Sequence, residues 1–456
     1  MAPPFEGLIR TREGDYNNWS MTLNRRSLLR HAAAAPFFVR SMLSAPPNST
    51  LRLAAFGAGN MGFETLDGIA THPKVTLACV AEVDSARLNR LKQKYPAARV
   101  YPDWRKMLAE ERRQVDIACV GTPDHMHAPI AVSAMNLGLP VYVQKPLAHD
   151  LFEVRTMAVL ARHRNLVTQM GIQVHSRAEY RKAVKVVQSG AIGKISAVHS
   201  WSNKKWGDTA IMPDRSDPVP PSLNWDLWLG VASPRPYIDG YYHPENWRKR
   251  IDFGTATFGD MGCHILDPVF GALDLTAPLW VRSDGPAPGQ HSWGLDNTIH
   301  YLFPGTHYTE GNQVAVTWYD GEKRPGDEVR ALIGSHALPG QGSIFIGSKG
   351  VMLLPHVANP VLFPEAQFRD FTMPEAESEN HYHQFVDAVL GDAKTSAAFH
   401  YSAALTETVL LGPLATRFPG ATLQWDADKL RVKNSPEANR LIRRKYRSGW
   451  KVKNLS

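Results

Sequence analysis

Residues 51–62 read LRLAAFGAGNMG, and this stretch decides the fold. A short apolar run typical of a buried strand leads directly into a GxGxxG turn, and Met61 to Ala70 continue with helical spacing. In such a unit the first glycine permits the tight turn, the second lets the backbone approach a pyrophosphate, and the third lets the helix pack on the strand. The sequence therefore predicts a dinucleotide-binding loop made by Gly57, Gly59, Asn60, Met61 and Gly62.

An acidic residue at the end of the next strand indicates which dinucleotide binds. Glu82 follows the apolar run Val75–Val80 and lies twenty residues after Gly62. A carboxylate there can accept hydrogen bonds from both ribose hydroxyls and repels a 2′-phosphate, so we predict NAD. Asp84, on the same side of an extended chain, is an alternative acceptor, and the nearby Arg87 keeps NADP possible as a cofactor.

Strand-like and helix-like segments alternate up to about residue 188. This alternation predicts parallel βαβ units, and hence an α/β Rossmann domain with a parallel sheet over residues 51–172. The further strands expected are Val115–Val120, Val141–Val143 and Leu166–Met170, and the further helices are Ser85–Tyr95, Ala128–Leu137 and Arg177–Gln188.

The pattern changes after about Gly193, where segments become less regular and richer in β-branched residues. We expect residues 173–456 to form a larger α+β domain with a mainly antiparallel open sheet. The expected strands are Ile195–Trp201, Thr298–Phe303, Gln313–Tyr319 and Gly342–Leu354, with a proline-rich loop at Asp208–Ser222 and final helices near His381–Val389 and Ser402–Leu414 that support the interdomain cleft.

Residues 1–50 have the features of a targeting extension that is cleaved or disordered. Residues 24–30, NRRSLLR, resemble the bacterial twin-arginine export motif, and the apolar stretch Ala32–Val39 follows. The expectation is a periplasmic or exported protein, or a cytoplasmic one if the signal is not functional. A start at Met21 would place the arginine pair where such a signal has it, and a chance pair in a disordered arm is the alternative.

The net charge of +8 is a property of the C-terminus. Residues 429–453 contain ten Lys or Arg and one acid, Glu437, so the rest of the chain has a net charge of −1. We interpret this run as a solvated helix face, and expect no nucleic-acid partner. No apolar run reaches the roughly 18 residues of a membrane span, so no integral membrane association is expected. Three scattered cysteines favour neither a disulfide framework nor a metal site.

A lysine follows the fourth expected strand. Residues 141–146, VYVQKP, place Lys145 at the carboxyl end of a parallel strand, where ligands bind in open α/β sheets. This turn, GAGNMG, residues 121–127 (GTPDHMH) and residues 259–264 (GDMGCH) occur in an order that resembles the Gfo/Idh/MocA family of glucose-fructose oxidoreductase and inositol dehydrogenase. The resemblance covers roughly Leu51 to Trp450.

The resemblance implies an oxidoreductase that transfers hydride between NAD and a secondary hydroxyl of a sugar or polyol, with Lys145, Asp260 and His264 as catalytic residues. Histidine titrates near working pH, so His264 is the expected base, and Asp260 lies one helical turn away on the same face. Lys145 would border the cofactor and donate to the oxygen that becomes carbonyl. Gln144 stands where the family has glutamate, which leaves the orientation of Lys145 open. The alternative to these catalytic roles is structural: Asp260 would cap or charge the first turn of the helix, and His264 would be a core histidine with its hydrogen bonds satisfied.

Other polar and aromatic residues complete the expected site. Thr122, Pro123 and His127 follow a strand on the cofactor side, and Gln173 follows the next strand. Further substrate-binding candidates lie at His243, Trp247 and Arg248, whose aromatic and polar groups suit a sugar ring, although such aromatic residues also serve as core or subunit contacts. By resemblance, we expect a homo-oligomer, a dimer or tetramer formed through the open sheet face.

Two other functions use the same residues. One is a glycoside hydrolase or lyase that holds NAD tightly, forms a transient keto-sugar and returns the hydride. An exported enzyme would favour it, because free NAD is not expected outside the cytoplasm. The other is a non-catalytic sugar- or NAD-binding sensor. Whether NAD is consumed or recycled distinguishes the first two functions.

Overall fold

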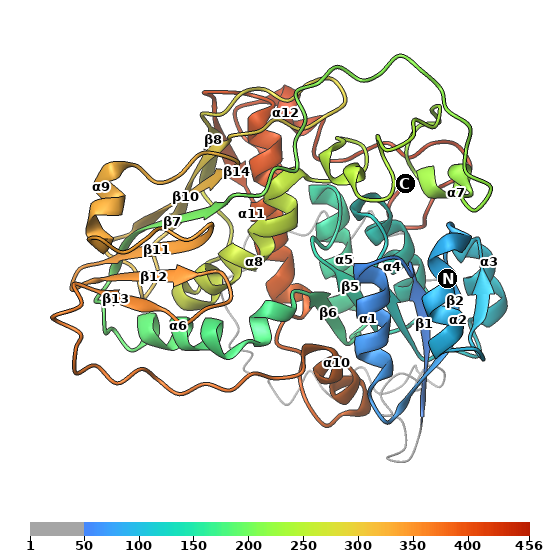
Figure 1. The fold of residues 1–456 in the computed structure, drawn as a ribbon, viewed down its shortest axis with the longest axis horizontal. Coiled ribbons are helices and arrows are strands. Elements are labelled where there is room, and N and C mark those ends of the chain that lie inside the picture. The colour runs from blue at the N-terminus through green and yellow to red at the C-terminus, as the bar shows by residue number, and fades with distance from the viewer. Residues whose placement is uncertain (1–49) are drawn as a thin grey trace, which may run out of the picture. The chain divides into compact units, whose positions relative to one another are not determined.

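Residues 50–456 are described by a computed structural model, and the expected export signal lies outside these residues. The described chain contains a six-stranded and a nine-stranded sheet. Figure 1 shows helices α8 (Ala256–Leu273) and α11 (Phe399–Thr416) between the two sheets. Helix α11 packs on α8, on helix α5 (Leu151–His163) and on strand β6 (Thr168–Gly171) of the first sheet, so the two domains share a helical layer.

The first sheet is entirely parallel and has the order β3-β2-β1-β4-β5-β6. The direction of strand order reverses between β1 and β4, and this switch point is where open α/β sheets bind ligands. The expected Rossmann fold is therefore confirmed. Its strands are β1 (Leu51–Phe56), β2 (Val75–Ala81), β3 (Arg99–Tyr101), β4 (Ile117–Val120), β5 (Val141–Gln144) and β6 (Thr168–Gly171).

Helices connect these strands, and three of them differ from expectation: the one expected from Ser85, and α3 (Trp104–Glu111) and α5, which the sequence analysis did not identify. The segment expected as one helix from Ser85 begins with a 3₁₀ turn, Ser85–Arg87, because the Asp84 side chain accepts from the Ala86 N–H and tightens the start. Helix α5 follows β5 and begins with a capping box of Asp150 and Glu153, a signal that the sequence analysis did not use. The helices are α1 (Met61–Ala70), α2 (Leu88–Lys94), α3 (Trp104–Glu111), α4 (His127–Asn136), α5 (Leu151–His163) and α6 (Ala178–Gln188).

The second sheet has the order β13-β12-β11-β7-β10-β9-β8-β14-β15, and only the β7–β10 pair is parallel. This confirms a larger, mainly antiparallel domain. The single strand expected at Gly342–Leu354 is wrong: a tight turn, in which the Gly347 N–H donates to the Gly350 carbonyl, splits it into two paired strands. The strands are β7 (Ile195–Ser202), β8 (Trp280–Ser283), β9 (Thr298–Pro304), β10 (Gln313–Asp320), β11 (Gln341–Gly347), β12 (Val351–Pro355), β13 (Val361–Phe363), β14 (Thr422–Asp426) and β15 (Arg431–Val432).

The basic C-terminal run does not form the expected helix face, although most of its Lys and Arg side chains are exposed to solvent. Its only helix is the short α12 (Pro436–Asn439). The Arg443 guanidinium lies 4.2 Å from the Phe152 ring centre, and Arg447 donates to Asp226 and stacks over Trp450. These contacts hold the tail in place because planar guanidinium groups both stack and donate. Separately, no helix in residues 50–456 has the length and apolar character needed to cross a bilayer.

Candidate active site

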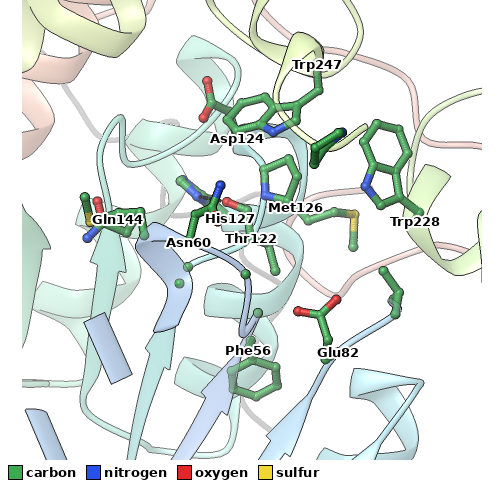
Figure 2. Close-up of a pocket in the computed structure, with 18 of the residues that line it drawn as sticks. Phe56, Asn60, Glu82, Thr122, Asp124, Met126, His127, Gln144, Trp228 and Trp247 are labelled. Atoms are coloured by element: carbon green, nitrogen blue, oxygen red, sulfur yellow. Dashed lines mark hydrogen bonds between the residues drawn. The ribbon is translucent and has the colours of Figure 1, made fainter. Parts of the chain in front are cut away.

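A cavity opens at the carboxyl ends of β1, β2, β4 and β5, and Figure 2 shows Glu82, Trp228 and Trp247 around it. It extends from the glycine loop to Lys145 and Asp260, so residues from both domains form one space. Gln173 and His264 are not among the lining residues. The expected site residues that do line it are Gly57, Gly59, Asn60, Met61, Gly62, Glu82, Thr122, Pro123, His127, Lys145, His243, Trp247, Arg248 and Asp260.

The glycine loop fits a dinucleotide phosphate. Gly57 has φ +90°, and a Cβ on either Gly57 or Gly62 would lie 2.7 Å from the Gly121 carbonyl oxygen. A Cβ on Gly59 would meet nothing nearer than the Arg87 side chain at 3.7 Å. Two glycines are therefore required for packing against the β4 turn, whereas Gly59 leaves open space over the N-terminus of α1, where a phosphate is favoured.

Glu82 lies on the cavity, but its carboxylate is partly engaged by the backbone. Oε2 accepts from the Ala58 N–H at 2.6 Å, and Oε1 accepts from the Asp84 N–H at 2.9 Å. Burial raises the pKa of Glu82, and these two N–H groups oppose that rise. A carboxylate has about four acceptor positions, so lone pairs remain for ribose hydroxyls. The alternative acceptor, Asp84, does not line the cavity.

Lys145 and Asp260 form an ion pair across the two domains. The Lys145 Nζ lies 2.8 Å from Asp260 Oδ1 and 2.7 Å from the Asp260 carbonyl oxygen. Trp206 Nε1 donates to Oδ2 at 2.9 Å, and Arg248 Nε lies 3.4 Å from Oδ1. Burial alone would raise the pKa of Asp260, but the charges of Lys145 and Arg248 hold it well below its usual range. The carboxylate thus stays ionised and orients the lysine, which keeps one N–H for a ligand.

Gln144 and His127 line the cavity near this pair, but their hydrogen bonds go to other parts of the Rossmann domain. Gln144 Nε2 donates to the Thr65 hydroxyl at 2.8 Å, and no hydrogen bond joins the Gln144 and Lys145 side chains in the described chain. The two His127 nitrogens lie 2.7 Å from the carbonyl oxygens of Thr122 and Pro146. Direct hydrogen bonding of His127 to a cofactor is therefore not what the geometry shows, because both nitrogens are already engaged.

His264 lies on α8 one turn beyond Asp260. Its Nδ1 is buried without a partner, whereas its Nε2 hydrogen-bonds to no described residue and is not fully buried. Burial, together with the positive charge of Lys145, holds the pKa of His264 well below its usual range, so the ring is neutral. A neutral imidazole with one accessible nitrogen is able to accept a proton. Gln173 contacts Met61 Sδ at 3.7 Å, next to the glycine loop.

His243 lines the cavity and is engaged by an acid that follows β2. Its Nε2 donates to Asp84 Oδ2 at 3.0 Å, two residues after Glu82. Arg248, by contrast, stacks over Trp247 at 4.4 Å and reaches Asp260, as expected for the substrate end.

Sequence reasoning missed Trp206, because a tryptophan in an irregular loop carries no periodic signal. Trp206 follows β7 closely, and the ends of strands in such domains are positions where ligand-contacting residues are common.

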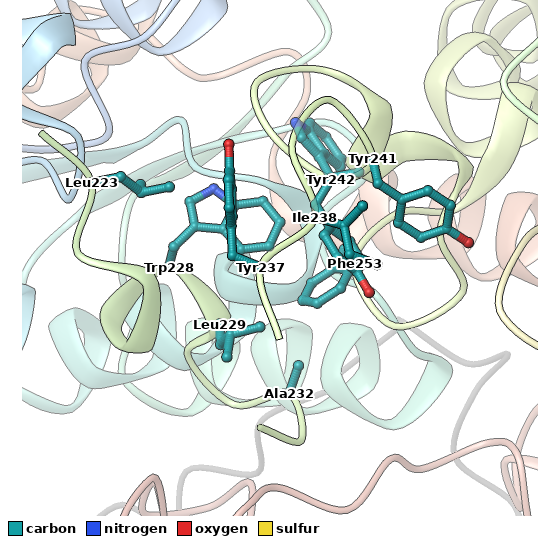
Figure 3. Close-up of a cluster of buried hydrophobic side chains, with 10 residues drawn as sticks. Leu223, Trp228, Leu229, Ala232, Tyr237, Ile238, Tyr241, Tyr242 and Phe253 are labelled. Carbon is teal, nitrogen blue, oxygen red and sulfur yellow. The ribbon is translucent and has the colours of Figure 1, made fainter. Parts of the chain in front are cut away.

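Residues 220–247, here named the covering segment, close the cofactor side of the cavity. The Ser85 N–H donates to the Ser222 carbonyl and the Asn224 N–H to the Val83 carbonyl, both at 2.8 Å. At the other end Asn60 Nδ2 donates to Glu245 Oε1 at 2.8 Å. Figure 3 shows the apolar cluster that supports the segment, including Trp228, Tyr237 and Phe253. The segment is thus attached both to the end of β2 and to the glycine loop.

A metal centre finds no support in the described part of the chain. Residues 50–456 contain no group of three or more His, Cys, Asp or Glu side chains arranged to hold a metal ion. The three cysteines are free and buried.

A parallel Rossmann sheet with a fitted glycine loop, and a cavity that ends on a Lys–Asp pair at the domain boundary, defines a dinucleotide-binding oxidoreductase class. Residues 51–172 match the oxidoreductase family model for the NAD-binding Rossmann fold, and residues 177–452 match the C-terminal alpha/beta domain of the same family. The chain therefore belongs to the Gfo/Idh/MocA oxidoreductase family.

Several curated relatives are sugar or polyol enzymes. The chain is 23% identical over 185 residues to levoglucosan dehydrogenase from Pseudarthrobacter phenanthrenivorans (39% of each chain) and 30% identical over 157 residues to inositol 2-dehydrogenase 4 from Saccharopolyspora erythraea (33% of this chain, 45% of the relative). An α-N-acetylgalactosaminidase from Shewanella oneidensis is 26% identical over 162 residues, covering 34% of this chain and 35% of the relative. These matches span less than half of each relative's length.

Solved structures share the fold over most of the chain. GenD2 from gentamicin A biosynthesis, in complex with NAD, has a TM-score of 0.56 at 17% identity and covers 86% of this chain and 100% of that chain. The WlbA dehydrogenase from Bordetella pertussis, in complex with NADH and UDP-GlcNAcA, has a TM-score of 0.59 at 14% identity, with 83% and 99% covered. At such identities the likeness shows the fold.

Proposed function

We propose that the chain is an NAD-dependent oxidoreductase that transfers hydride between the nicotinamide and a secondary hydroxyl of a sugar or polyol. The observation that carries this proposal is the Lys145–Asp260 pair, 2.8 Å apart, at the far end of the cavity that starts at the glycine loop. The sugar- and polyol-acting relatives support the substrate class.

The residues present fit NAD. Gly59 leaves room for a phosphate, and Glu82 offers a carboxylate for the ribose. Thr122 and Pro123 border the same space after β4. When bound, NAD supplies the hydride acceptor for an alcohol or, when reduced, the hydride donor for a ketone.

The remaining chemistry is assigned to three side chains. Lys145 donates its free N–H to the substrate oxygen and stabilises negative charge on it as the carbon–oxygen double bond forms. His264 accepts the hydroxyl proton on Nε2, which has no other partner among the described residues. Asp260 keeps the Lys145 side chain directed toward the substrate position through their 2.8 Å ion pair.

The test is a coupled measurement of binding and turnover. Purified protein is titrated with NAD by calorimetry and then assayed for NADH formation with levoglucosan, myo-inositol and a panel of simple sugars. NAD binding with NADH formation on at least one polyol is the expected result. Binding of NAD and sugar without NADH formation would overturn the dehydrogenase reaction and favour either an enzyme that returns the hydride or a non-catalytic sensor. Failure to bind NAD would overturn the proposal.

A second candidate function is supported by the covering segment. Hydrogen bonds to Val83, Ser85 and Asn60 attach this segment beside the cavity, as expected where a cofactor stays bound through turnover. In that case the hydride returns to the sugar, and the net reaction is cleavage of a glycosidic bond. The α-N-acetylgalactosaminidase relative supports this candidate.

Cofactor release distinguishes the two candidates. Protein purified without added nucleotide is denatured, and the released NAD and NADH are quantified by mass spectrometry. About one nucleotide per chain would favour recycling, and assays of glycoside cleavage would follow. An empty protein that binds NAD reversibly would favour a conventional dehydrogenase.

Export and assembly remain proposals. Twin-arginine export predicts that Arg25→Lys with Arg26→Lys retains the protein in the cytoplasm, as measured by cell fractionation. A homo-oligomer predicts a mass of two or four chains by light scattering. A cytoplasmic location of the unaltered protein would overturn the first, and a monomer would overturn the second.

A further inference from the structure

A second histidine lies beside the proposed base. His356 follows strand β12, and its ring centre is 6.0 Å from that of His264 on α8, with 42° between the ring planes. No hydrogen bond joins the two rings within the described chain. The nine-stranded sheet positions His356, because the backbone N–H of His356 donates to the Gln341 carbonyl at 2.9 Å. Two separate elements therefore bring two imidazoles to one location.

Tyr180 fixes how the His356 ring is turned. The Tyr180 Oη lies 2.6 Å from His356 Nδ1, and the Tyr180 side chain is 2% exposed. Burial raises the pKa of Tyr180, so the phenol keeps its proton. We assign the Tyr180 hydroxyl as the donor to His356 Nδ1, which leaves the ring proton of His356 on Nε2.

The second ring nitrogen of His356 has no hydrogen-bond partner among residues 50–456. This nitrogen, Nε2, is absent from the fully buried polar atoms that lack a partner. Burial, with the charges of Lys145 and Lys204, lowers the pKa of His356 to about 4, so the ring is neutral near pH 7. Nε2–H is thus an unused hydrogen-bond donor within electrostatic reach of Lys145.

The backbone next to His356 is strained. Val357 has φ +59°, a conformation that a β-branched residue rarely adopts. Such a conformation is unfavourable and persists where the surroundings fix it, often in ligand sites. Here it directly follows His356, which supports a functional reason for the arrangement.

We propose that His356, oriented by Tyr180, is a substrate-binding residue that donates a hydrogen bond from Nε2 to a hydroxyl adjacent to the one that His264 deprotonates. Each nitrogen reaches an oxygen about 2.8 Å away, so two rings at this separation can address two neighbouring hydroxyls. The substrate class is accordingly a vicinal diol within a sugar or polyol. This inference rests on the proposed oxidoreductase function.

The experiment compares His356→Asn with His356→Gln in the full chain. Asparagine keeps a polar group near the Nδ1 position, toward Tyr180, but lacks the Nε2 donor, whereas the longer glutamine places an N–H near Nε2. With levoglucosan or myo-inositol, His356→Asn should raise KM about tenfold while kcat changes less, and His356→Gln should recover most of the loss. Tyr180→Phe, which alters a positioning residue, should raise KM by a smaller factor. The control is His163→Asn, at an exposed position at the end of α5.

Mono-deoxy analogues of the better substrate identify the hydroxyl. His356→Asn should not raise KM further for the analogue that lacks the bonded hydroxyl, and should do so for the others. Equal KM values for His356→Asn and the unaltered chain, or equal losses in the asparagine and glutamine variants, would overturn the inference while the proposed function stands. NADH formation with neither polyol nor sugar would overturn the proposed function, and the inference with it.

Discussion

The Lys145 ammonium lies 2.8 Å from Asp260 Oδ1, although the two residues come from different domains. Removing either charge should therefore disturb the reaction more than the fold. We expect Lys145→Met and Asp260→Asn each to lower kcat by about 100- to 1000-fold, the scale of losing one electrostatic contact to the transition state. Steady-state kinetics test this, with the exposed Lys92→Met as a control. A loss below tenfold in both variants would contradict the assigned roles.

The pH dependence should report the neutral state of His264. Burial and the charge of Lys145 hold the pKa of His264 below the ordinary value of 6.5. Because the base works when unprotonated, kcat/KM for alcohol oxidation should stay level as pH falls to about 6.5 and decline only below it.

Asp260 and Lys145 should move the acidic limb of the pH profile, where kcat/KM declines, in opposite directions. Asp260 raises the pKa of His264 and Lys145 lowers it, so Asp260→Asn should shift the limb to lower pH and Lys145→Met to higher pH. NMR titration of the His264 ring measures this even where activity is low. Shifts in the same direction would show that the two charges do not act on His264 as placed.

The sequence predicted what local periodicity encodes. Strands such as Leu51–Phe56 and helices such as Met61–Ala70 agree with the structure residue for residue, because hydrophobic spacing and a glycine turn are properties of neighbouring residues. The turn that divides Gly342–Leu354 into two strands was missed, because a two-strand hairpin and one long strand show the same alternation of side chains.

Long-range partners could not be predicted in this way. His243 was expected at the substrate but pairs with Asp84, a residue 159 positions away. Gln144, whose effect on the orientation of Lys145 the sequence left open, donates to Thr65, 79 positions away. A single sequence specifies residue types at a turn but does not specify which distant side chain meets them. The glycine loop, Lys145 and Trp247 were therefore found, while Trp206 and the hydrogen bonds that attach the covering segment were not.

The cofactor preference should depend on the charge of Glu82. The unaltered chain should prefer NAD, because a carboxylate beside the ribose repels a 2′-phosphate. Glu82→Gln should narrow the preference for NAD over NADP by about tenfold, equivalent to roughly 1.4 kcal/mol. Calorimetric Kd values for both nucleotides test this. Arg87→Ala added to Glu82→Gln should weaken the binding of NADP and not of NAD, since Arg87 is a cation that lines the cavity together with Glu82.

Two glycines of the same loop should respond differently to alanine. A Cβ at Gly62 would lie 2.7 Å from the Gly121 carbonyl oxygen, whereas a Cβ at Gly59 would meet only the Arg87 side chain at 3.7 Å. Gly62→Ala should therefore lower the free energy of unfolding by about 1–3 kcal/mol. Gly59→Ala should leave it nearly unchanged and weaken NAD binding. Urea denaturation measures the stability of both variants, and calorimetry measures their NAD binding. Equal effects of the two substitutions on either quantity would contradict the different roles assigned to Gly59 and Gly62.

The covering segment should control how fast the nucleotide leaves. Glu245 accepts from Asn60 in the glycine loop, and this is the segment's one side-chain bond to that loop among the hydrogen bonds of residues 50–456. A typical hydrogen bond contributes about 1 kcal/mol, so Glu245→Ala should raise the NAD dissociation rate by roughly fivefold. Stopped-flow displacement of NADH measures the rate, and Glu365→Ala, at an exposed position outside the cavity, is the matched control. An unchanged rate would mean that the segment lies over the cavity without retaining the cofactor, and the case for a resident NAD that is recycled within the site would then lose its structural support.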